Sequence, residues 1–389
     1  MRYRDLGRTG VRVSALGLGM MRLPLRDGSQ GYTGIASGQV DVEASISLLR
    51  RATELGINYI DTAYNYLDGD SEKITGLALR DGYREKVILA TKAPVWLYRS
   101  AEDFDRYLEE QMERLGTDYV DVYLLHGVNR AIWEKRVQRY HVLERMERAR
   151  QSGKVRWIGF SFHDDLDAFR AVVDGYPHWD LCQIQLNYYD TKFQAGQKGL
   201  KYAYERGLGV SIMEPLRGGY LTRLPSNARE ALASAPTKRS AAEWAFDFLW
   251  NQREVGTVLS GMGTIAQVEE NAAYADRSAV GMLTQEEQCV YQTVCSRLAE
   301  HHTIPCTGCA YCMHCPQRVA IPYNFFAYND YMTSGDLKHA QHYYDVQFKT
   351  FGAQAAACIG CKKCEDLCPQ HIPISEWMPI IARLLGRGK

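Results

Sequence analysis

The 389-residue chain lacks features that would assign it to several classes of protein. No apolar run reaches the roughly 18 residues of a membrane-spanning helix, so we expect no membrane insertion. Lys plus Arg and Asp plus Glu both total 46, and this balance leaves no basic surface for nucleic acid or an anionic membrane. The charged N-terminus leads straight into strand-like sequence with no secretory signal, which predicts a cytoplasmic protein.

Cysteine is scarce in the first three quarters of the chain. Of the 11 cysteines, only Cys182 precedes Cys289, and eight lie between Cys306 and Cys368. In a cytosolic chain such clustering favours ligation of a metal or cluster over disulfide bonds. We therefore expect a cysteine-poor module followed by a metal-binding tail.

Short apolar strands alternate with helical sequence eight times before residue 275. The predicted strands are Ala15–Met20, Asn58–Ile60, Val87–Ala90, Val120–Leu125, Val155–Phe160, Leu181–Leu186, Val210–Met213 and Val255–Leu259. Strands of this kind are typical of a sheet buried on both faces. The alternation favours an α/β fold of the (β/α)8 TIM-barrel type over a doubly wound sheet. No Gly-x-Gly-x-x-Gly follows a strand, which argues against a Rossmann domain. Capping-box patterns mark helix starts at Ser100–Asp103 and Thr284–Glu287.

Polar residues end several of these strands, on the face where barrel enzymes carry their catalytic groups. Asp61, Lys92 and His126 end the second, third and fourth strands, and Tyr66 lies on the loop after Asp61. A lysine beside a phenol lowers its pKa from about 10, and a carboxylate keeps that lysine charged. A histidine N–H can orient a carbonyl oxygen. Each residue alone could serve packing or capping, but together they predict proton delivery to a carbonyl as a hydride arrives.

These residues sit in motifs that resemble those of the aldo-keto reductase family. The motifs are Asp61-Thr-Ala-Tyr-Asn-Tyr66, Val87–Lys92 and Asp121–His126, and the resemblance spans roughly residues 1–275. It implies a catalytic tetrad of Asp61, Tyr66, Lys92 and His126, with Tyr66 as proton donor. It also implies a nicotinamide-dependent oxidoreductase acting on a small-molecule carbonyl or alcohol.

The family binds its nicotinamide cofactor at the same rim without a Rossmann domain. The positions of this chain that match its cofactor-binding residues are Gly19, Met20, Ser161, Gln183, Pro215, Leu216, Ser260, Gly261, Met262, Gln267 and Asn271. Gln183 can hold a carboxamide, and the loop before the helix at Ile265 can take a phosphate on its amides. Thr264 stands where the family often carries the arginine that clamps a 2′-phosphate. The resemblance therefore implies NADP or NAD as the cofactor.

The tail carries two cysteine runs. The spacing of Cys358, Cys361, Cys364 and Cys368-Pro369 fits the bacterial iron–sulfur run, in which the fourth cysteine serves the other cluster. The first run, Cys306 to Cys315, is one residue short before its last cysteine. The predicted ligands are Cys306, Cys309, Cys312 and Cys368 for one [4Fe–4S] cluster, and Cys358, Cys361, Cys364 and Cys315 for the other. A pair of zinc sites is the alternative, because sets of four thiolates also suit zinc.

Helical sequence between the runs resembles helical ferredoxin modules, and the whole chain resembles an aldo-keto reductase subfamily with such a tail. We expect a barrel over residues 1–280, a connecting helix over 281–304 and a mainly helical ferredoxin-like domain over 305–389. The clusters could be structural or could serve an electron-transfer partner, because hydride transfer moves two electrons and no flavin motif is present. A rival hypothesis is a redox sensor or electron carrier whose barrel binds the cofactor without turnover.

Overall fold

The computed structural model describes residues 1–26, 40–313, 315–351 and 353–386. It divides into two compact units. The first holds most of residues 1–215 together with Glu243–Leu283, and the second holds Leu216–Ala242 and the chain from Thr284 onward. No helix in the described ranges is long and apolar enough to cross a membrane.

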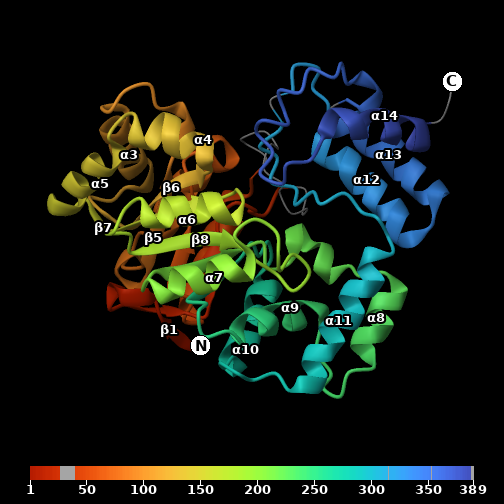
Figure 1. The fold of residues 1–389 in the computed structure, drawn as a ribbon, viewed down its shortest axis with the longest axis horizontal. Helices are drawn as coiled ribbons and strands as arrows, with labels where there is room; N and C mark the ends of the chain where they lie inside the picture. The colour runs from red at the N-terminus through yellow and green to blue at the C-terminus, as the bar shows by residue number, and fades with distance from the viewer. Residues whose placement is uncertain (27–39, 314, 352, 387–389) are drawn as a thin grey trace. The chain divides into compact units, whose positions relative to one another are not determined.

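The first unit is built on a closed barrel of eight parallel strands, which confirms the predicted fold (Figure 1). The strands are β3 (Leu16–Gly19), β4 (Tyr59–Asp61), β5 (Ile88–Ala93), β6 (Val120–Val128), β7 (Val155–Phe162), β8 (Leu181–Gln185), β9 (Gly209–Met213) and β10 (Thr257–Ser260). They pair in chain order, and β10 closes the barrel by pairing Val258 with Leu16 of β3. All carboxyl ends therefore meet at one rim.

A hairpin precedes the barrel. Strands β1 (Tyr3–Asp5) and β2 (Arg12–Ser14) pair antiparallel, and a 3-10 turn, η1 (Gly7–Thr9), joins them. Leu6 and Val13 are fully buried and belong to one apolar cluster with Tyr59 and Val122 of the barrel strands. The hairpin thus contributes to the barrel core.

Helices surround the barrel strands (Figure 1). They are α1 (Val42–Glu54), α2 (Asp70–Ala78), α3 (Asp103–Leu115), α4 (Arg130–Ile132), α5 (Val142–Gln151), α6 (Leu166–Asp174), α7 (Gly196–Glu205), α9 (Ala241–Trp250) and α10 (Ile265–Arg277). Short 3-10 or π segments are η2 (Tyr66–Gly69), η3 (Arg84–Lys86), η4 (Val95–Leu97) and η5 (Trp133–Gln138). Asp41 caps α1 by accepting from the Ala44 amide at 2.9 Å, and left-handed Gly116 ends α3.

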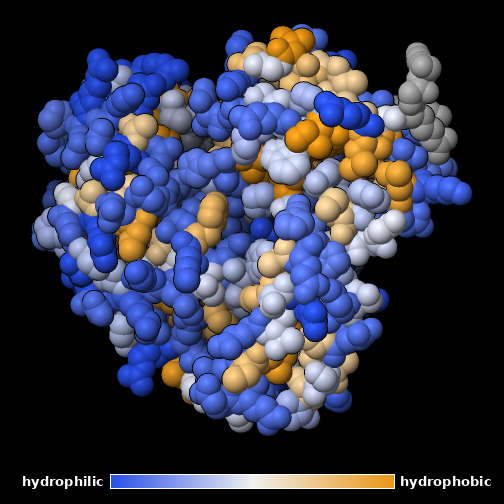
Figure 2. All heavy atoms as spheres, turned by 45° about the vertical axis from the view of Figure 1, so that its right-hand side comes forward, coloured by the Kyte–Doolittle hydropathy of each residue, from blue (hydrophilic) through white to orange (hydrophobic). Residues whose placement is uncertain are grey.

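The second unit is helical. Its elements are η6 (Arg217–Thr222), α8 (Ser226–Ala233), α11 (Gln285–Ala299), α12 (Ile321–Ser334), α13 (Leu337–Phe351), η7 (Ala355–Ala357) and α14 (Ile374–Leu385). Helix α11 begins with the predicted capping box, in which Thr284 and Glu287 bond each other's amides at 3.2 and 2.9 Å. Side chains of α12, α13 and α14 share one buried core. Figure 2 shows further hydrophobic residues at the surface near the C-terminal end, and Ile380 of α14 is 45% exposed.

Candidate active site

Lys92 lies at the centre of the predicted tetrad. Its Nζ donates to Asp61 Oδ1 at 2.6 Å, to the carbonyl oxygen of Thr62 at 2.8 Å and to the hydroxyl of Tyr66 at 3.1 Å. Parallel pairing of β4 with β5 sets Asp61 opposite Ala90, so Lys92 reaches across the rim from two residues further along. The three bonds use all three N–H donors of an ammonium group. The Tyr66 oxygen accepts from the lysine, so this bond does not use the proton of the hydroxyl.

This cluster is almost entirely removed from water. Lys92, Asp61 and Tyr66 expose 0%, 3% and 7% of their surface. Burial lowers the pKa of Lys92, and the ion pair with Asp61 opposes that fall. The geometry therefore holds a cation against a phenol where solvent screens little of their interaction.

His126 of β6 lies beside the phenol. The centres of the two rings are 5.8 Å apart and their planes lie at 83°. The centre of the Trp96 ring lies 5.2 Å from the centre of the imidazole. Burial lowers the pKa of His126 well below its usual 6.5, and nearby Lys92 and His163 lower it further. The imidazole is therefore neutral at pH 7 and can donate one N–H to a carbonyl oxygen.

Several predicted cofactor residues lie at the same rim. Gln183 of β8 donates to Asp61 Oδ2 at 3.0 Å, and it pairs with Ser161 of β7. The Ser161 hydroxyl accepts from the Gly127 amide at 2.8 Å. Gly19 pairs with Asp61 in the sheet, and the Met20 amide donates to the Asp61 carbonyl at 2.8 Å. The structure thus brings these four residues around Asp61, as their positions at strand ends predict.

The remaining predicted cofactor residues follow β9 and β10. Pro215 and Leu216 lie just after β9, and Ser260, Gly261 and Met262 run from the end of β10 toward α10. Asn271 donates to the Ser260 hydroxyl at 3.5 Å.

The Gln267 side chain turns back to accept from the Gly263 amide at 2.9 Å, while Thr264 caps α10. A Cβ added at Gly261 would meet the side chain of Arg22 at 3.4 Å. Arg22 therefore lies against the loop predicted to take phosphate, a position that the sequence did not indicate.

Sequence reasoning missed other groups at the rim. The carbonyl oxygen of Thr62 accepts one of the three N–H bonds of Lys92. This acceptor belongs to the backbone, so the type of residue at position 62 does not reveal it. Trp96 contacts the imidazole from the loop after β5, and no sequence pattern pairs it with His126. Glu72 and Gln111 are fully buried polar residues close to Lys92. A carboxylate on the inner face of a helix that follows the Asp61 strand was the available signal for Glu72.

The tail cysteines fall into two neighbourhoods. None of the eleven cysteines of the chain forms a disulfide in the structure. Burial raises the pKa of the Cys312 thiol, and four neighbouring cysteines raise it further: Cys309, Cys306, Cys368 and Cys364. Burial likewise raises the pKa of Cys364 to about 11, with contributions from Glu365, Cys315 and Cys358.

Three of the four neighbours of Cys312, namely Cys306, Cys309 and Cys368, are its predicted partners in one cluster. Both cysteine neighbours of Cys364, Cys315 and Cys358, are its predicted partners in the other cluster. Within the described residues, no three His, Cys, Asp or Glu side chains are arranged to hold a single metal ion. A cubane differs from such a site because each thiolate binds a different iron. An all-thiol donor set in these two neighbourhoods fits the iron–sulfur assignment.

The two cysteine runs share one local structure. In each run the first cysteine's Sγ accepts at 3.4 Å from the amide of the glycine two residues later. Left-handed residues recur at matching places, and the pairs are Gly308 with Gly360, Ala310 with Lys362, and Arg318 with His371. The paired residues are 52 positions apart in the first two pairs and 53 apart in the third, because the second run has one more residue before its last cysteine, Cys368. The two cysteine runs therefore form a structural repeat.

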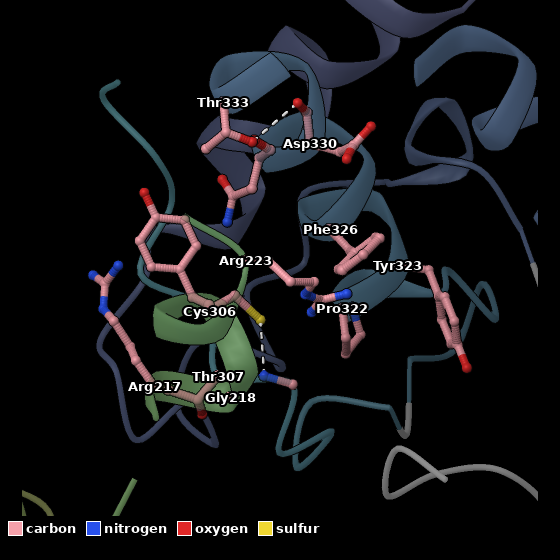
Figure 3. A pocket seen from close by; sticks show the side chains of 13 residues that line it. Arg217, Gly218, Arg223, Cys306, Thr307, Pro322, Tyr323, Phe326, Asp330 and Thr333 are labelled. Atoms are coloured by element: carbon pink, nitrogen blue, oxygen red, sulfur yellow. Dashed lines mark hydrogen bonds between the residues drawn. The ribbon is translucent and has the colours of Figure 1, made fainter. Parts of the chain in front are cut away.

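A cavity of the second unit opens beside the first run (Figure 3). Cys306, Thr307 and Gly308 form one wall, and α12 and η6 form the others. Figure 3 shows the Arg223 guanidinium beside Phe326, with a distance of 4.8 Å to the ring centre. Gly218 is left-handed, and a Cβ there would lie 2.5 Å from the Thr307 carbonyl oxygen. The η6 turn thus needs a glycine to approach the cysteine run.

Comparison with known families assigns both parts of the chain. The model of the aldo/keto reductase family matches residues 15–281, which is more than half of the sequence. The chain belongs to the aldo/keto reductase family. A 4Fe-4S dicluster domain matches residues 305–372. The protein is thus an aldo/keto reductase with an iron–sulfur tail, as its motifs predict.

Curated and solved relatives agree with this family. The chain is similar to L-galactose dehydrogenase of Arabidopsis thaliana, with 30% identity over 72% of this chain and 90% of that protein. It is similar to methylglyoxal reductase YeaE of Escherichia coli, with 36% identity over 66% and 86% of the two chains. Among solved structures it resembles the aldo-keto reductase AKR11C1 from Bacillus halodurans in its holo form. That match has a TM-score of 0.61, 27% identity and coverage of 76% of this chain and 96% of the other.

Proposed function

We propose that this aldo/keto reductase interconverts a small-molecule carbonyl and its alcohol, with Tyr66 as the general acid and base. The observation that supports this most is the Lys92 ammonium, which bonds Asp61 at 2.6 Å and the Tyr66 hydroxyl at 3.1 Å in a buried cluster. The relatives' names add support, because they include a sugar dehydrogenase and a methylglyoxal reductase.

Each residue of the tetrad has a role in proton transfer. A nicotinamide held at this rim would supply the hydride that reduces the carbonyl carbon. Tyr66 donates its proton to the carbonyl oxygen, and Lys92 stabilises the tyrosinate that forms. Asp61 holds the ammonium in place and offsets part of its desolvation. Neutral His126 donates an N–H that orients the carbonyl oxygen. In the reverse direction Tyr66 accepts the proton of the alcohol.

The residues around Asp61 and at the start of α10 would hold the cofactor. Gln183 and Ser161 offer amide and hydroxyl groups for a carboxamide near the tetrad. Ser260, Gly261 and Met262 lead to the first amides of α10, where a helix N-terminus favours phosphate. Both NADH and NADPH are compatible with Thr264 at the position of the family's frequent arginine. The side chain of Arg22 beside Gly261 offers a cation on the opposite wall of that loop.

The decisive experiment measures steady-state oxidation of NADH and NADPH with a panel of aldehydes and ketones. We expect turnover by the wild type and a loss of about 100- to 10,000-fold in kcat for Tyr66→Phe, with cofactor binding retained. Tyr64→Phe is the matched control, because that hydroxyl faces Glu110 instead of Lys92. Turnover by neither wild type nor variants, together with cofactor binding, would favour the sensor or carrier hypothesis.

For the tail we propose two [4Fe–4S] clusters with the crossed ligand sets given by the cysteine spacing. Such clusters transfer one electron at a time. The neighbours of Cys312 and Cys364 support the crossing. Anaerobically purified protein should be brown, with broad absorption near about 400 nm that a reductant bleaches. Colourless protein containing zinc would support the zinc alternative.

We propose that the second cysteine run forms part of a docking surface for an electron-transfer partner. Ile359 and Leu367 are 64% and 45% exposed, and Lys362 and Lys363 are exposed beside them. Exposed apolar side chains rimmed by charge are typical of contact sites. We propose a cytoplasmic location, because none of the eleven cysteines forms a disulfide. We propose domain limits at residues 280 and 305, next to the ends of the two family matches.

A further inference from the structure

The loop that carries Tyr66 has an unfavourable backbone conformation. Leu67, Asp68 and Gly69 follow one another in the left-handed region, with φ of 51°, 54° and 92°. Two of the three are not glycine, and such residues persist only where their surroundings impose the conformation. Something outside the loop must therefore hold it in place.

Arg114 of α3 contacts this loop on both sides of Tyr66. Its Nη1 donates to the carbonyl oxygen of Tyr64 at 3.1 Å, and its guanidinium lies 4.2 Å from the centre of the Tyr64 ring. On the other side, a Cβ at Gly69 would come within 2.9 Å of the same Nη1. The guanidinium thus fits closely against the residues two before and three after Tyr66.

Glu72 of α2 fixes Arg114 from within the fold. Its carboxylate is fully buried, and Oε2 pairs with Arg114 Nη1 at 3.2 Å. Its other oxygen accepts from the hydroxyl of Thr91 at 2.7 Å and from Gln111 Nε2 at 2.5 Å. Gln111 also donates to the carbonyl oxygen of Lys92 at 3.1 Å. One connected network therefore joins the Tyr66 loop to the strand that carries Lys92.

Of the two carboxylates that pair with Arg114, Glu72 is fully buried and Glu110 is partly exposed. Burial raises the pKa of Glu72, while its bonds to Thr91, Gln111 and Arg114 lower it. The negative charge of Glu72 also favours the ammonium form of Lys92. Glu110, on the same helix as Arg114, pairs with the second guanidinium nitrogen and is partly exposed. The buried member of the pair with Arg114 is therefore Glu72.

We infer that the Glu72–Arg114 ion pair is a positioning device that keeps the Tyr66 hydroxyl within hydrogen-bond distance of Lys92. This rests on the proposed role of Tyr66 in proton transfer. Arg114 acts on Tyr66 through its contacts with the loop, and Glu72 acts through Arg114, through the strand that carries Lys92 and through its charge on Lys92. Loosening the loop should raise the apparent pKa of the proton donor, because tyrosinate would lose part of its contact with the ammonium.

The test compares Glu72→Gln, Arg114→Met and Arg114→Lys with wild type. We expect kcat to fall about 10- to 100-fold in the first two, since small misplacements of reacting groups have effects of this order. The Kd of the cofactor should stay within about twofold. The pH profile of kcat/KM should move so that the limb assigned to Tyr66 appears at higher pH. Arg114→Lys should recover part of kcat, because it keeps the charge but not the planar fork.

A second readout does not depend on turnover. Hydrogen–deuterium exchange of the peptide covering residues 64–69 should be at least about tenfold faster in Glu72→Gln and Arg114→Met. The matched control is Arg84→Met, which breaks the buried pair of Arg84 with Asp121 at 2.8 Å near the start of β6. It should lower the unfolding midpoint but leave the exchange of this loop and the pH profile unchanged.

The outcomes separate this inference from the proposed function. If Glu72→Gln and Arg114→Met fold but their loop exchanges at the wild-type rate, the inference is overturned. It is also overturned if Arg84→Met changes the loop exchange and the pH profile as much as they do. A wild type that reduces no carbonyl while the loop exchange still depends on the pair would overturn the role of Tyr66 but retain the structural clamp. If Glu72→Gln does not fold, Arg114→Lys decides the question through the same two readouts.

Discussion

Lys92 and Asp61 form an ion pair of 2.6 Å in which the two side chains expose only 1% and 4% of their surface. Removing two charges from water is costly, so a buried pair is stable only where further hydrogen bonds complete it. The Thr62 carbonyl, the Tyr66 hydroxyl and Gln183 supply those bonds. Site chemistry and local stability therefore depend on the same atoms.

Breaking this pair should be strongly destabilising. Asp61→Asn leaves a buried ammonium without its counterion, and we expect the free energy of unfolding to fall by about 3–5 kcal/mol. The double variant Asp61→Asn/Lys92→Met should recover part of that loss, because no unpaired charge remains. Urea denaturation measures both effects. The control Arg50→Met breaks an exposed pair with Asp81 and should cost at most about 1 kcal/mol. If Asp61→Asn and Arg50→Met lowered the free energy of unfolding equally, burial of the Asp61–Lys92 pair would not explain the loss.

His126 predicts a specific dependence of stability on pH. Burial holds its pKa well below 6.5 in the folded state, so the unfolded chain binds the proton first as the pH falls. Stability should therefore decrease as the pH is lowered from about 7 through 6.5, with a limiting slope of about 1.4 kcal/mol per pH unit from this group.

The difference between wild type and His126→Gln isolates this contribution. Thermal or urea unfolding between pH 5 and pH 8 measures it, and the difference between the two stability curves should become constant above about pH 7.5. Parallel curves over the whole range would show that the imidazole is not held neutral by burial.

Iron counting tests the crossed ligand sets. In Cys312→Ser/Cys368→Ser both substitutions fall in one predicted cluster, so about four of eight irons should remain. In Cys312→Ser/Cys315→Ser each cluster loses one ligand, so both should be impaired. Iron and sulfide analysis of anaerobically prepared protein distinguishes the two variants. Cys289→Ser, outside both runs, is the control, and retention of four irons in the second double variant would exclude crossing.

The close approach of η6 to the first run predicts a steric effect on cluster assembly. Gly218→Ala adds a Cβ that would lie 2.5 Å from the Thr307 carbonyl oxygen, at a φ of 66°. We expect lower iron content, because the segment that begins with Cys306 must shift. Gly335→Ala carries a similar φ of 72° with nothing within 4 Å of the added atom. The two variants carry similar backbone strain and differ in the steric clash with Thr307. Equal iron contents in the two variants would show that this clash does not affect cluster assembly.

Much of the site follows from sequence because parallel strands align their ends. Once eight strand–helix units are recognised, Asp61, Lys92 and His126 must lie at one rim, and the structure places them there. The capping box of Thr284 and Glu287 is confirmed for a similar reason, since both bonds are local.

The other predicted capping box is wrong in part. Helix α3 has Glu102 at its N-cap position, with no side-chain cap bond. Only one half of the pattern forms, in which Asp103 accepts from the Ser100 amide at 3.1 Å. The Asp103 carboxylate also serves the Arg99 amide and Arg106, so the turn before the helix sets its start. Local patterns fail where the preceding chain competes for the same groups.

The sequence by itself determined the repeating units, the residues at the strand ends and the cysteine spacing, because each depends on neighbours along the chain. Only the tertiary structure decided that a backbone carbonyl completes the bonds of Lys92, and that Arg114 and Glu72 meet beneath the Tyr66 loop. Those contacts join residues about 30 to 50 positions apart. Their partners are chosen by packing, which no local pattern of side chains encodes.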